Sequence, residues 1–403
     1  MSSGDSTEIA IVGGGPAGAA LAINLRRRGH EVVLFERRAE PRWRACGVYS
    51  SPLSRRRLSA LGFTNAELAT LIRPISAMVV RQVDGPTVRL EYPAPRHACG
   101  FERVGLDSLL LERADQAGAE VRQRAVIRQV EFAGHRRGRL LVADVAGSRW
   151  WSARLIVGAD GPRSIVARSA GVVIPNRRFR RAGITVHVAD HSAAPEGEAM
   201  EAQLFLGSGW YCGIAPVPGG RVNVGIVLGE DALRRQLADG EDVNAVVANI
   251  LARLPKEGRQ WQALAPMDPV QVALPLAHRV RRAAGSRFLL VGDAAGFVDP
   301  LSGEGLHRAL VSAEMAAEAI TLWTHRGGRL EAYDRRLKAR FRNKDLVSWV
   351  LQAFLERSWA MSYALERLGR REALGRTFAL ALADLTPPSR VLDPRFLGRL
   401  LRP

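Results

Sequence analysis

The N-terminal part of the chain alternates short apolar runs with a stretch of helical period. Residues 8–12 and 30–35 are apolar and rich in β-formers, and residues 19–28 between them follow a helical pattern that stops at Gly29. Continuous apolar runs of this length are typical of strands buried on both faces of a parallel sheet. The pattern therefore predicts a strand–helix–strand unit, with Glu36 directly after its second strand.

The middle of the chain follows a different pattern, in which apolar and polar residues alternate. Residues 77–92 and 183–228 are rich in β-formers and interrupted by Gly and Pro turns, which predicts a hairpin and an antiparallel sheet. The C-terminal residues 331–403 are helical in pattern. Further helical patterns cover residues 55–72, 103–118, 231–254 and 306–323, and further strands are expected within 120–151 and at 155–157, 270–276 and 287–291.

Composition narrows the class of protein without naming a function. Of the 403 residues, 47% are hydrophobic and 24% charged, which excludes a collagen, a coiled-coil rod and wholesale disorder. Three widely spaced cysteines cannot build a disulfide scaffold or a four-ligand zinc site. No apolar run approaches the roughly 18–20 residues of a membrane span, and the polar N-terminus lacks a secretory pattern, so we expect a cytoplasmic protein.

The net charge of +18 is the unusual quantity, and all but three of the 58 basic residues are arginine. One interpretation is an arginine-rich surface without a specific role. The other is attraction to anionic substrates or acidic lipid. Nucleic acid is not expected as a partner, because no helix-turn-helix, zinc or aromatic–basic pattern is present.

The turn after the first predicted strand carries a GxGxxG motif at Gly13, Gly15 and Gly18. The first glycine allows a tight turn, the second lets the backbone approach a pyrophosphate, and the third lets helix and strand pack closely. The positive end of the helix dipole adds attraction for the phosphates. Glu36, which follows Gly18 by 18 residues, can accept hydrogen bonds from both ribose hydroxyls and would repel a 2′-phosphate, which argues against NADP at this position.

Later motifs decide which dinucleotide is expected. They are Ala45-Cys46-Gly47, Arg103 with Asp107 and Leu110, Val157-Gly-Ala-Asp160-Gly161, and Gly292-Asp293 followed by Pro300-Leu-Ser-Gly-Glu-Gly-Leu-His307. With GGGPAG and Glu36, these motifs resemble the p-hydroxybenzoate hydroxylase-like flavoproteins and, within them, the geranylgeranyl reductase family. The resemblance runs from residue 8 to about residue 318 and implies FAD as the cofactor.

The resemblance also implies roles for single residues. Asp293 would bind the ribitol chain, Asp160 and Gly161 would support the cofactor from beneath, and Arg103 would lie along the phosphates and ribityl chain. The backbone around Glu304 would face the pyrimidine edge of the flavin, where a helix N-terminus stabilises an anionic reduced ring. The predicted FAD contacts are Gly13, Gly15, Pro16, Ala17, Gly18, Glu36, Arg37, Cys46, Gly47, Arg103, Asp160, Gly161, Gly292, Asp293, Gly303, Gly305 and Leu306.

Three residues are candidates for catalysis. Cys46 could tune the flavin or donate a proton, because Arg42 and Arg44 are close in sequence and would lower a thiol pKa; the alternative is a small packing residue. Tyr49 and His307 are alternative proton donors. His307 lies in the first turn of a predicted helix, where the dipole would lower its pKa.

The expected fold is α/β: a Rossmann-like FAD-binding domain, an inserted β-rich (α+β) substrate domain and a helical C-terminal cap. We assign residues 1–72, 100–176 and 284–330 to the FAD-binding domain, 73–99 and 177–283 to the substrate domain, and 331–403 to the C-terminal helical region. The basic and aromatic C-terminal part also favours, as an alternative to a packed cap, peripheral contact with a membrane or lipid substrate.

The expected function is that of an FAD-dependent oxidoreductase that reduces or dehydrogenates a carbon–carbon bond by hydride transfer at flavin N5. The expected substrate is a hydrophobic, isoprenoid- or polyketide-like small molecule. The expected reductant is NAD(P)H or a small electron carrier. Two alternatives stay open: a single-component flavin monooxygenase acting through a C4a-hydroperoxyflavin, and a flavin-bearing binding protein without turnover. Residues 210–216 depart from the family's bulky aromatic strand and lack the pattern of flavin-dependent halogenases, so the family's long isoprenoid substrate is not carried over directly.

Overall fold

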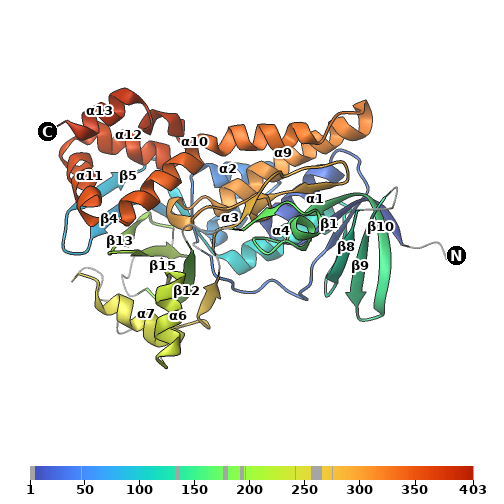
Figure 1. The fold of residues 1–403 in the computed structure, drawn as a ribbon, viewed down its shortest axis with the longest axis horizontal. Helices are drawn as coiled ribbons and strands as arrows, with labels where there is room; N and C mark the ends of the chain where they lie inside the picture. Colours follow the sequence, from blue (N-terminus) through green and yellow to red (C-terminus); the bar gives the residue numbers. More distant parts are fainter. Residues whose placement is uncertain are drawn as a thin grey trace.

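The computed structural model places two large sheets side by side, with helices around both (Figure 1). It describes residues 5–46, 48–132, 137–175, 180–190, 195, 197–240, 242–255, 266–274 and 276–402. Gly47, a predicted FAD contact, lies outside these residues. The predicted α/β class with a β-rich part and a helical C-terminal cap is confirmed, whereas the exact domain boundaries stay a prediction.

The first sheet contains the N-terminal strand–helix–strand unit and has the strand order β7-β2-β1-β10-β9-β8, with β18 paired to β10. The pairs of β1 with β2 and β10, of β2 with β7 and of β10 with β18 are parallel, as the continuous apolar runs predict. The strands are β1 (Ser6–Val12), β2 (Val32–Phe35), β7 (Glu120–Arg122), β8 (Val126–Glu131), β9 (Gly138–Asp144), β10 (Gly147–Gly158) and β18 (Phe288–Leu290).

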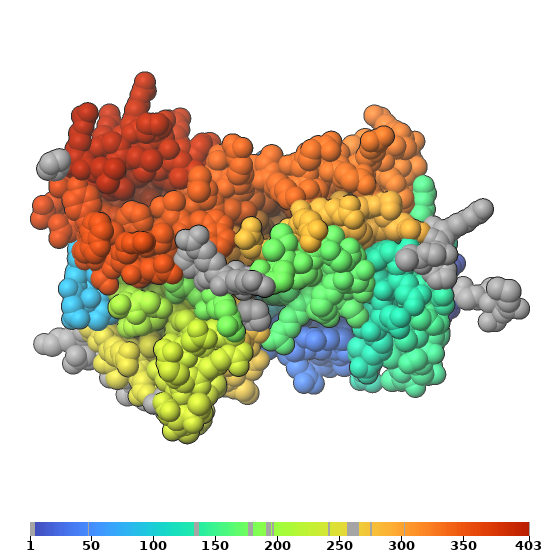
Figure 2. Space-filling model, in the orientation of Figure 1, coloured from blue at the N-terminus to red at the C-terminus, as the bar shows by residue number. Residues whose placement is uncertain are grey.

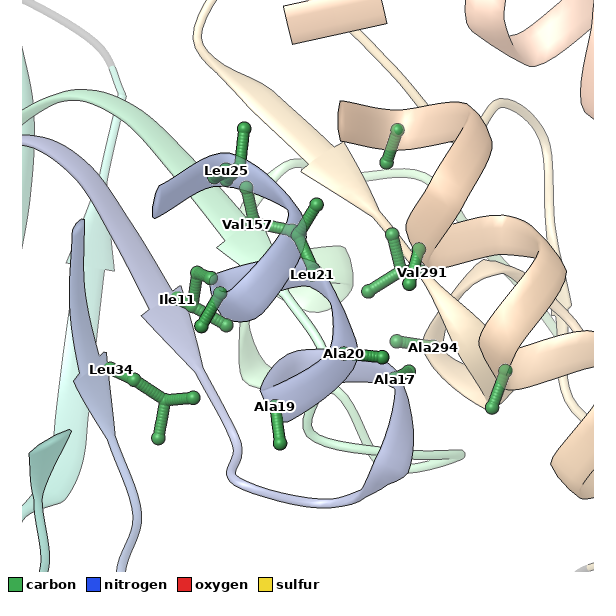
Figure 3. Close-up of a cluster of buried hydrophobic side chains, with 14 of the residues drawn as sticks. Ile11, Ala17, Ala19, Ala20, Leu21, Leu25, Leu34, Val157, Val291 and Ala294 are labelled. Carbon is green, nitrogen blue, oxygen red and sulfur yellow. The ribbon is translucent and has the colours of Figure 1, made fainter. Parts of the chain in front are cut away.

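Helix α1 (Pro16–Arg26) packs over this sheet against α4 (Arg103–Gln116) and α9 (Gly305–Arg326). Figure 3 shows Leu21 and Leu25 of α1 gathered with Ile11 of β1 and Val157 of β10. Each fully buried leucine or isoleucine here stabilises the fold by about 1.5–3 kcal/mol. The small residues at the start of α1 let its backbone lie close to the strands, so the GxGxxG turn is held by the largest core of the molecule.

The second sheet has the order β16-β12-β15-β14-β13-β4-β6-β3, with β5 paired to β4, and only its β4–β13 pair is parallel. One face packs on α6 (Glu230–Ala238) and α7 (Val243–Ala252). The strands are β3 (Tyr49–Ser50), β4 (Ile72–Gln82), β5 (Thr87–Glu91), β6 (Ala98–Phe101), β12 (Arg181–Ala189), β13 (Met200–Leu206), β14 (Trp210–Val217), β15 (Arg221–Gly229) and β16 (Gln271–Ala273). Strand β3 thus joins this sheet although its residues were assigned to the FAD-binding domain.

Most of the C-terminal helical region covers one end of the opposite face of the second sheet and forms one end of the molecule, while Tyr333, Leu337 and Phe341 at its start pack into the core of the first sheet (Figures 1 and 2). The apolar residues of the covering part pack on side chains of β4, β5 and β13. The helices of the region are α10 (Glu331–Leu355), α11 (Ser358–Arg370), α12 (Glu372–Leu382) and α13 (Pro394–Leu401). Within the described ranges, no helix combines the length and the apolar character needed to cross a membrane.

Two helical predictions and one strand prediction differ from the structure. Residues 55–72 form two helices, α2 (Leu53–Ala60) and α3 (Asn65–Leu71), because Gly62 takes a φ of +100° and Thr64 caps α3 through a capping box with Glu67. The stretch 231–254 likewise divides into α6 and α7. Strand β10 is continuous, since its first half pairs with β9 and its second half with β1 and β18.

The remaining elements are short. They are α5 (Ile165–Ser169), β11 (Val173–Ile174), which pairs with β17 (Arg279–Val280), and the 3-10 turns η1 (Gly292–Ala295), η2 (Pro300–Ser302) and η3 (Pro388–Val391).

Candidate functional site

The glycine-rich turn between β1 and α1 is packed on one side and open on the other. A Cβ on Gly13 would collide with the carbonyl of Ala159, and one on Gly18 with the carbonyl of Gly13, whereas a Cβ on Gly15 would meet nothing within 4 Å. No side chain caps the N-terminus of α1, so the first-turn N–H groups of Ala17 and Gly18 have no side-chain acceptor there. Backbone donors beside an open glycine suit a pyrophosphate.

Glu36 is 7% exposed and lies against this turn. Its Oε2 accepts a hydrogen bond from the N–H of Gly14 at 2.8 Å and its Oε1 one from the N–H of Arg38 at 3.1 Å. A carboxylate has about four acceptor positions, so both oxygens can still accept hydrogen bonds from ribose hydroxyls. Arg37, also predicted to contact the cofactor, is exposed at the surface.

The Val157-Gly-Ala-Asp160-Gly161 turn at the end of β10 lies directly beside the GxGxxG turn, because the Cβ position of Gly13 falls within 3 Å of Asp160 Cα. Asp160 Oδ2 accepts from the N–H of Ile165 at 2.6 Å, which fixes the turn. Burial raises the pKa of Asp160. A Cβ on Gly161 would again meet open space, so the two turns present open backbone on neighbouring segments.

Arg103 connects three of the predicted site residues. Its Nη1 lies 2.7 Å from Cys46 Sγ, and its Nη2 donates to the Asp107 carboxylate at 3.0 Å. Burial raises the pKa of Asp293, and the charges of Arg308 and Arg103 oppose this shift. The structure thus brings Cys46, Arg103, Asp107 and Asp293 into one cluster.

The expectation that arginines lower the thiol pKa of Cys46 is wrong. Burial raises that pKa, the charges of Asp107 and Asp293 raise it further, and Arg103 compensates only in part. The compensating charge belongs to Arg103 of α4, whose Nη1 contacts the sulfur. Cys46 is therefore held as a neutral thiol, which suits a proton donor better than a thiolate nucleophile.

The Gly-Glu-Gly segment before α9 meets Tyr49. Gly303 has a φ of +65°, and a Cβ there would collide with the ring of Tyr49, while a Cβ on Gly305 would meet nothing within 4 Å. Gly292 has a different role, because its N–H donates to Ser312 Oγ of α9 at 2.8 Å and its α-carbon lies against Ala17. Gly292 thereby fixes α9 against α1.

The two other candidate proton donors are held neutral by burial. Tyr49 donates a hydrogen bond to Tyr92 Oη at 2.7 Å, and burial raises the pKa of Tyr49 well above its usual value and that of Tyr92 to about 12. His307 is 2% exposed, and neither ring nitrogen has a hydrogen-bond partner among the described residues. Its pKa is lowered to about 4, chiefly by burial and only secondarily by the charges of Arg57 and Arg340.

A buried ion cluster behind the Gly-Glu-Gly segment was not foreseen. Lys344 of α10 lies 2.8 Å from Glu304 Oε1 and 2.9 Å from Asp384 Oδ1, and its Nζ donates to the carbonyl of Leu382 at 2.8 Å. Lys344 is only 2% exposed. Its position between Phe341 and Val347, on the apolar stripe of the helix, is the sequence signal that could have revealed it.

A second unforeseen contact joins the flavin motif to the second sheet. Tyr211 of β14 donates to Asp299 Oδ1 at 2.7 Å, and the same oxygen accepts from the N–H of Leu301 at 2.9 Å. Burial raises the pKa of Asp299 to about 6. Asp299 therefore fixes the segment that leads to Gly303.

Comparison with known proteins identifies an FAD-binding family and reductase relatives. A family model described as FAD binding domain matches residues 6–343. Digeranylgeranylglycerophospholipid reductase 2 of Methanopyrus kandleri is 29% identical, with 78% of this chain and 77% of the relative covered. Menaquinone reductase of Mycolicibacterium smegmatis is also 29% identical, with 78% and 76% covered.

A solved structure shares the fold. It is a geranylgeranyl bacteriochlorophyll reductase-like protein from Thermoplasma acidophilum, with a TM-score of 0.78 and 19% identity over 98% of this chain and all (100%) of that one. At this identity the likeness concerns the fold alone.

Proposed function

The chain belongs to the FAD binding domain family and is an FAD-dependent oxidoreductase, and we propose that it reduces a carbon–carbon double bond in a hydrophobic small molecule. The observation that carries this proposal is a pair of neutral proton donors: Tyr49, whose ring lies against Gly303 of the Gly-Glu-Gly segment, and Cys46, which contacts Arg103. Reduction of a double bond requires a proton as well as a hydride, and both groups have raised pKa values that keep their protons in place at neutral pH.

The residues around the glycine turns fit FAD. Gly15 and Gly161 leave open backbone for the pyrophosphate, Glu36 presents acceptors for the ribose, and Asp293 and Arg103 lie together where the ribityl chain is expected. FAD, when bound, supplies hydride chemistry at N5. The protein orients this group, excludes water from it and holds the proton on Cys46 or Tyr49.

The substrate class follows from the relatives. Two of them carry names that refer to isoprenoid lipids or an isoprenoid quinone, and we infer that the substrate of this chain is likewise an isoprenoid or a ring with an isoprenoid chain. NAD(P)H or a small electron carrier is the inferred reductant. Glu36 confines a 2′-phosphorylated nucleotide to a place other than the GxGxxG turn.

Contact with a lipid surface is part of the proposal. The C-terminal helices carry exposed apolar residues, among them Trp359 at 75% and Leu401 at 66% exposure, on an arginine-rich part of the chain. Basic and apolar side chains together favour the interface of an anionic membrane. Sedimentation with phosphatidylglycerol vesicles but not with phosphatidylcholine vesicles, weakened by Trp359→Gln, is the expected result.

Product analysis in the absence and in the presence of oxygen tests the proposed reaction. The purified flavoprotein is reduced with dithionite, freed of excess reductant and mixed with isoprenoid or isoprenoid-quinone substrates, without oxygen and then with it. We expect a product that is two hydrogens heavier and reoxidised flavin in the absence of oxygen. An oxygenated product that forms only in air would replace the proposal with a monooxygenase, and flavin that never reoxidises with any substrate would leave a binding protein.

A further inference from the structure

The face of the second sheet opposite α6 and α7 carries a polar strip between two apolar clusters. In the antiparallel pairs of β12 with β15, Thr185 lies opposite Gly225 and His187 opposite Asn223. Residues directly opposite each other share a face. Towards one end of this face Tyr211 and Val227 pack under the C-terminal helices, and at the other Ala215 and Val217 pack with Val48 and Tyr92 beside the candidate proton donors.

The strip is buried, and each of its three side chains has one polar atom without a partner among the described residues. Thr185, His187 and Asn223 are 6%, 3% and 2% exposed. Thr185 Oγ1, His187 Nε2 and Asn223 Oδ1 have no hydrogen-bond partner within the part of the chain that the structure describes. An unpaired buried polar atom destabilises a protein, so three on adjacent positions point to a bound group that pairs them.

His187 has a defined acceptor atom. Its Nδ1 lies 2.7 Å from the carboxylate of Asp268, so Nδ1 carries the proton and Nε2 keeps its lone pair in the neutral ring. Burial lowers the pKa of His187, which favours that neutral form. The strip therefore combines an imidazole acceptor, a hydroxyl and an amide, and it can accept a hydrogen bond from a hydroxyl group of a ligand.

The floor beside the strip is flat and accessible. Gly213 and Gly225 lie opposite each other and are only half-buried, although their neighbours along both strands are buried. A Cβ on Gly213 would have its nearest neighbours at 3.9 and 4.0 Å, so the space above it is not filled. A pair of glycines without side chains gives a smooth surface on which a planar ring can lie.

A flat ring of the protein, that of Trp43, already lies at the edge of this floor. Trp43 stacks on His187 with 3.9 Å between ring centroids and an interplanar angle of 35°. Trp43 belongs to the segment that leads to Cys46, which connects the strip to the candidate catalytic residues. The Nε1 of Trp43 is also buried without a partner among the described residues, so a donor and several acceptors surround the same place.

We propose that Thr185, His187 and Asn223, with Gly213 and Gly225 as the floor and Trp43 at the edge, form a subsite that binds a planar ring bearing a hydroxyl group, such as a phenol or quinol head group. This inference rests on the proposed function, since it places the ring of the substrate in this subsite and the apolar chain of the substrate at the site of double-bond reduction. It selects ring-bearing substrates over linear isoprenoids without a ring.

A matched pair of probes tests the subsite without turnover. Binding of 2-naphthol and of naphthalene, which differ by one hydroxyl group, is measured through the change in flavin absorbance of the oxidised holoprotein. We expect 2-naphthol to bind at least about tenfold more tightly than naphthalene, because its hydroxyl can donate to one of the buried acceptors and accept from Thr185 Oγ1, which naphthalene cannot do. His187→Phe, which keeps the stacked ring, and Asn223→Leu should each reduce this preference to less than about threefold.

Gln203→Leu is the control variant, since Gln203 lies on the opposite face of the same sheet and its Oε1 is likewise buried without a partner among the described residues. It should leave the tenfold preference unchanged. Equal affinity for both probes, no binding of either, or a preference that His187→Phe and Asn223→Leu leave intact would overturn the subsite and leave ordered water as the partner of the strip. Because this readout needs no reaction, the subsite can stand or fall separately from double-bond reduction.

Discussion

The glycine turns at the carboxyl ends of β1 and β10 differ from the sheet face around Thr185 in how their polar groups are satisfied. At the turns, both oxygens of Glu36 and one oxygen of Asp160 accept hydrogen bonds from backbone N–H groups of nearby segments, and only Asp160 Oδ1 of these carboxylate oxygens lacks a partner among the described residues. On the sheet face, Thr185 Oγ1, His187 Nε2 and Asn223 Oδ1 are buried without a hydrogen-bond partner among the described residues. The glycine turns are therefore organised before any ligand binds, whereas the polar groups of the sheet face depend on a ligand for their hydrogen bonds.

The ion cluster behind Glu304 is a third arrangement, since its charges pair with one another. Lys344→Met would leave the buried carboxylates of Glu304 and Asp384 without their cation. Breaking a buried pair from one side costs about 3–5 kcal/mol, so we expect a loss of that size in the free energy of unfolding. Urea denaturation measures it.

Lys338→Met is the control on the same helix, because Lys338 pairs with Asp334 but is 56% exposed. An exposed pair contributes at most about 1 kcal/mol. If both variants lost the same small amount of unfolding free energy, the buried cluster would contribute no more than a surface ion pair. The ion pairs would then not stabilise the packing of the C-terminal cap against the Gly-Glu-Gly segment.

The next prediction tests the claim that the turn is organised in advance. Gly15 has a φ of −69°, which any residue adopts, and a Cβ there meets nothing within 4 Å. Gly15→Val should therefore fold normally but place its side chain where the pyrophosphate is expected, and FAD affinity should fall at least about 100-fold, which equals about 2.7 kcal/mol. Flavin content and thermal unfolding of the apoprotein measure the two effects.

Gly398→Val, at another open glycine but on α13, should change neither quantity beyond a small helix-propensity effect. A Gly15→Val protein that purifies fully yellow would show that the pyrophosphate lies elsewhere. One that fails to fold would show that the turn has no spare room, which would contradict the comparison made above.

The glycine turn is a region whose local structure can be predicted from the sequence. The GxGxxG turn and Glu36 are 23 residues apart at most, and their geometry follows from local strand and helix patterns that the sequence displays directly. The motifs around Asp160 and Asp293 each follow a recognisable strand, whereas the role of the Gly303 segment was expected only from the family resemblance. The α/β class was predictable for the same reason.

Contacts between distant segments were not predictable in this way. Lys344 meets Glu304 and Asp384 across 40 residues on either side, and His187 meets Trp43 across 144 positions. The pKa of Cys46 was predicted in the wrong direction because its neighbours in sequence, Arg42 and Arg44, are not its main neighbours in space, and because burial was not visible. Burial and long-range pairing set these energies, and one sequence shows neither.

The titration of Asp299 predicts a smaller effect, a decrease in folding stability as the pH rises. Its folded-state pKa is raised from 3.8 to about 6 by burial, so the folded protein binds the proton more tightly than the unfolded chain does. The resulting stabilisation is complete below about pH 4 and is lost as the pH rises to about 6. Asp299→Asn keeps an oxygen for Tyr211 and removes the titration, so it should gain about 1–2 kcal/mol of stability relative to the wild type between pH 4 and pH 6.5.

Urea unfolding of both proteins at several pH values in this window gives the difference directly. Tyr211→Phe removes the hydrogen bond without removing the carboxyl group and should leave the pH dependence in place. A constant difference between Asp299→Asn and the wild type over the whole window would mean that Asp299 does not titrate there.

The smallest effect concerns the proton. Cys46→Ala should slow turnover by about tenfold while FAD stays bound, because general acid catalysis is lost and Tyr49 and water remain as weaker substitutes. Cys212→Ala is the matched control, since Cys212 is buried, its pKa is raised to about 12 and it lies on β14 in the core that packs on α6 and α7. Single-turnover reoxidation of the reduced flavin by substrate separates this step from substrate binding and product release. An unchanged rate in Cys46→Ala together with a slower rate in Tyr49→Phe would assign the role of proton donor to Tyr49. Cys46 would then be a packing residue beside Arg103, held in place before any ligand binds as the glycine turns are.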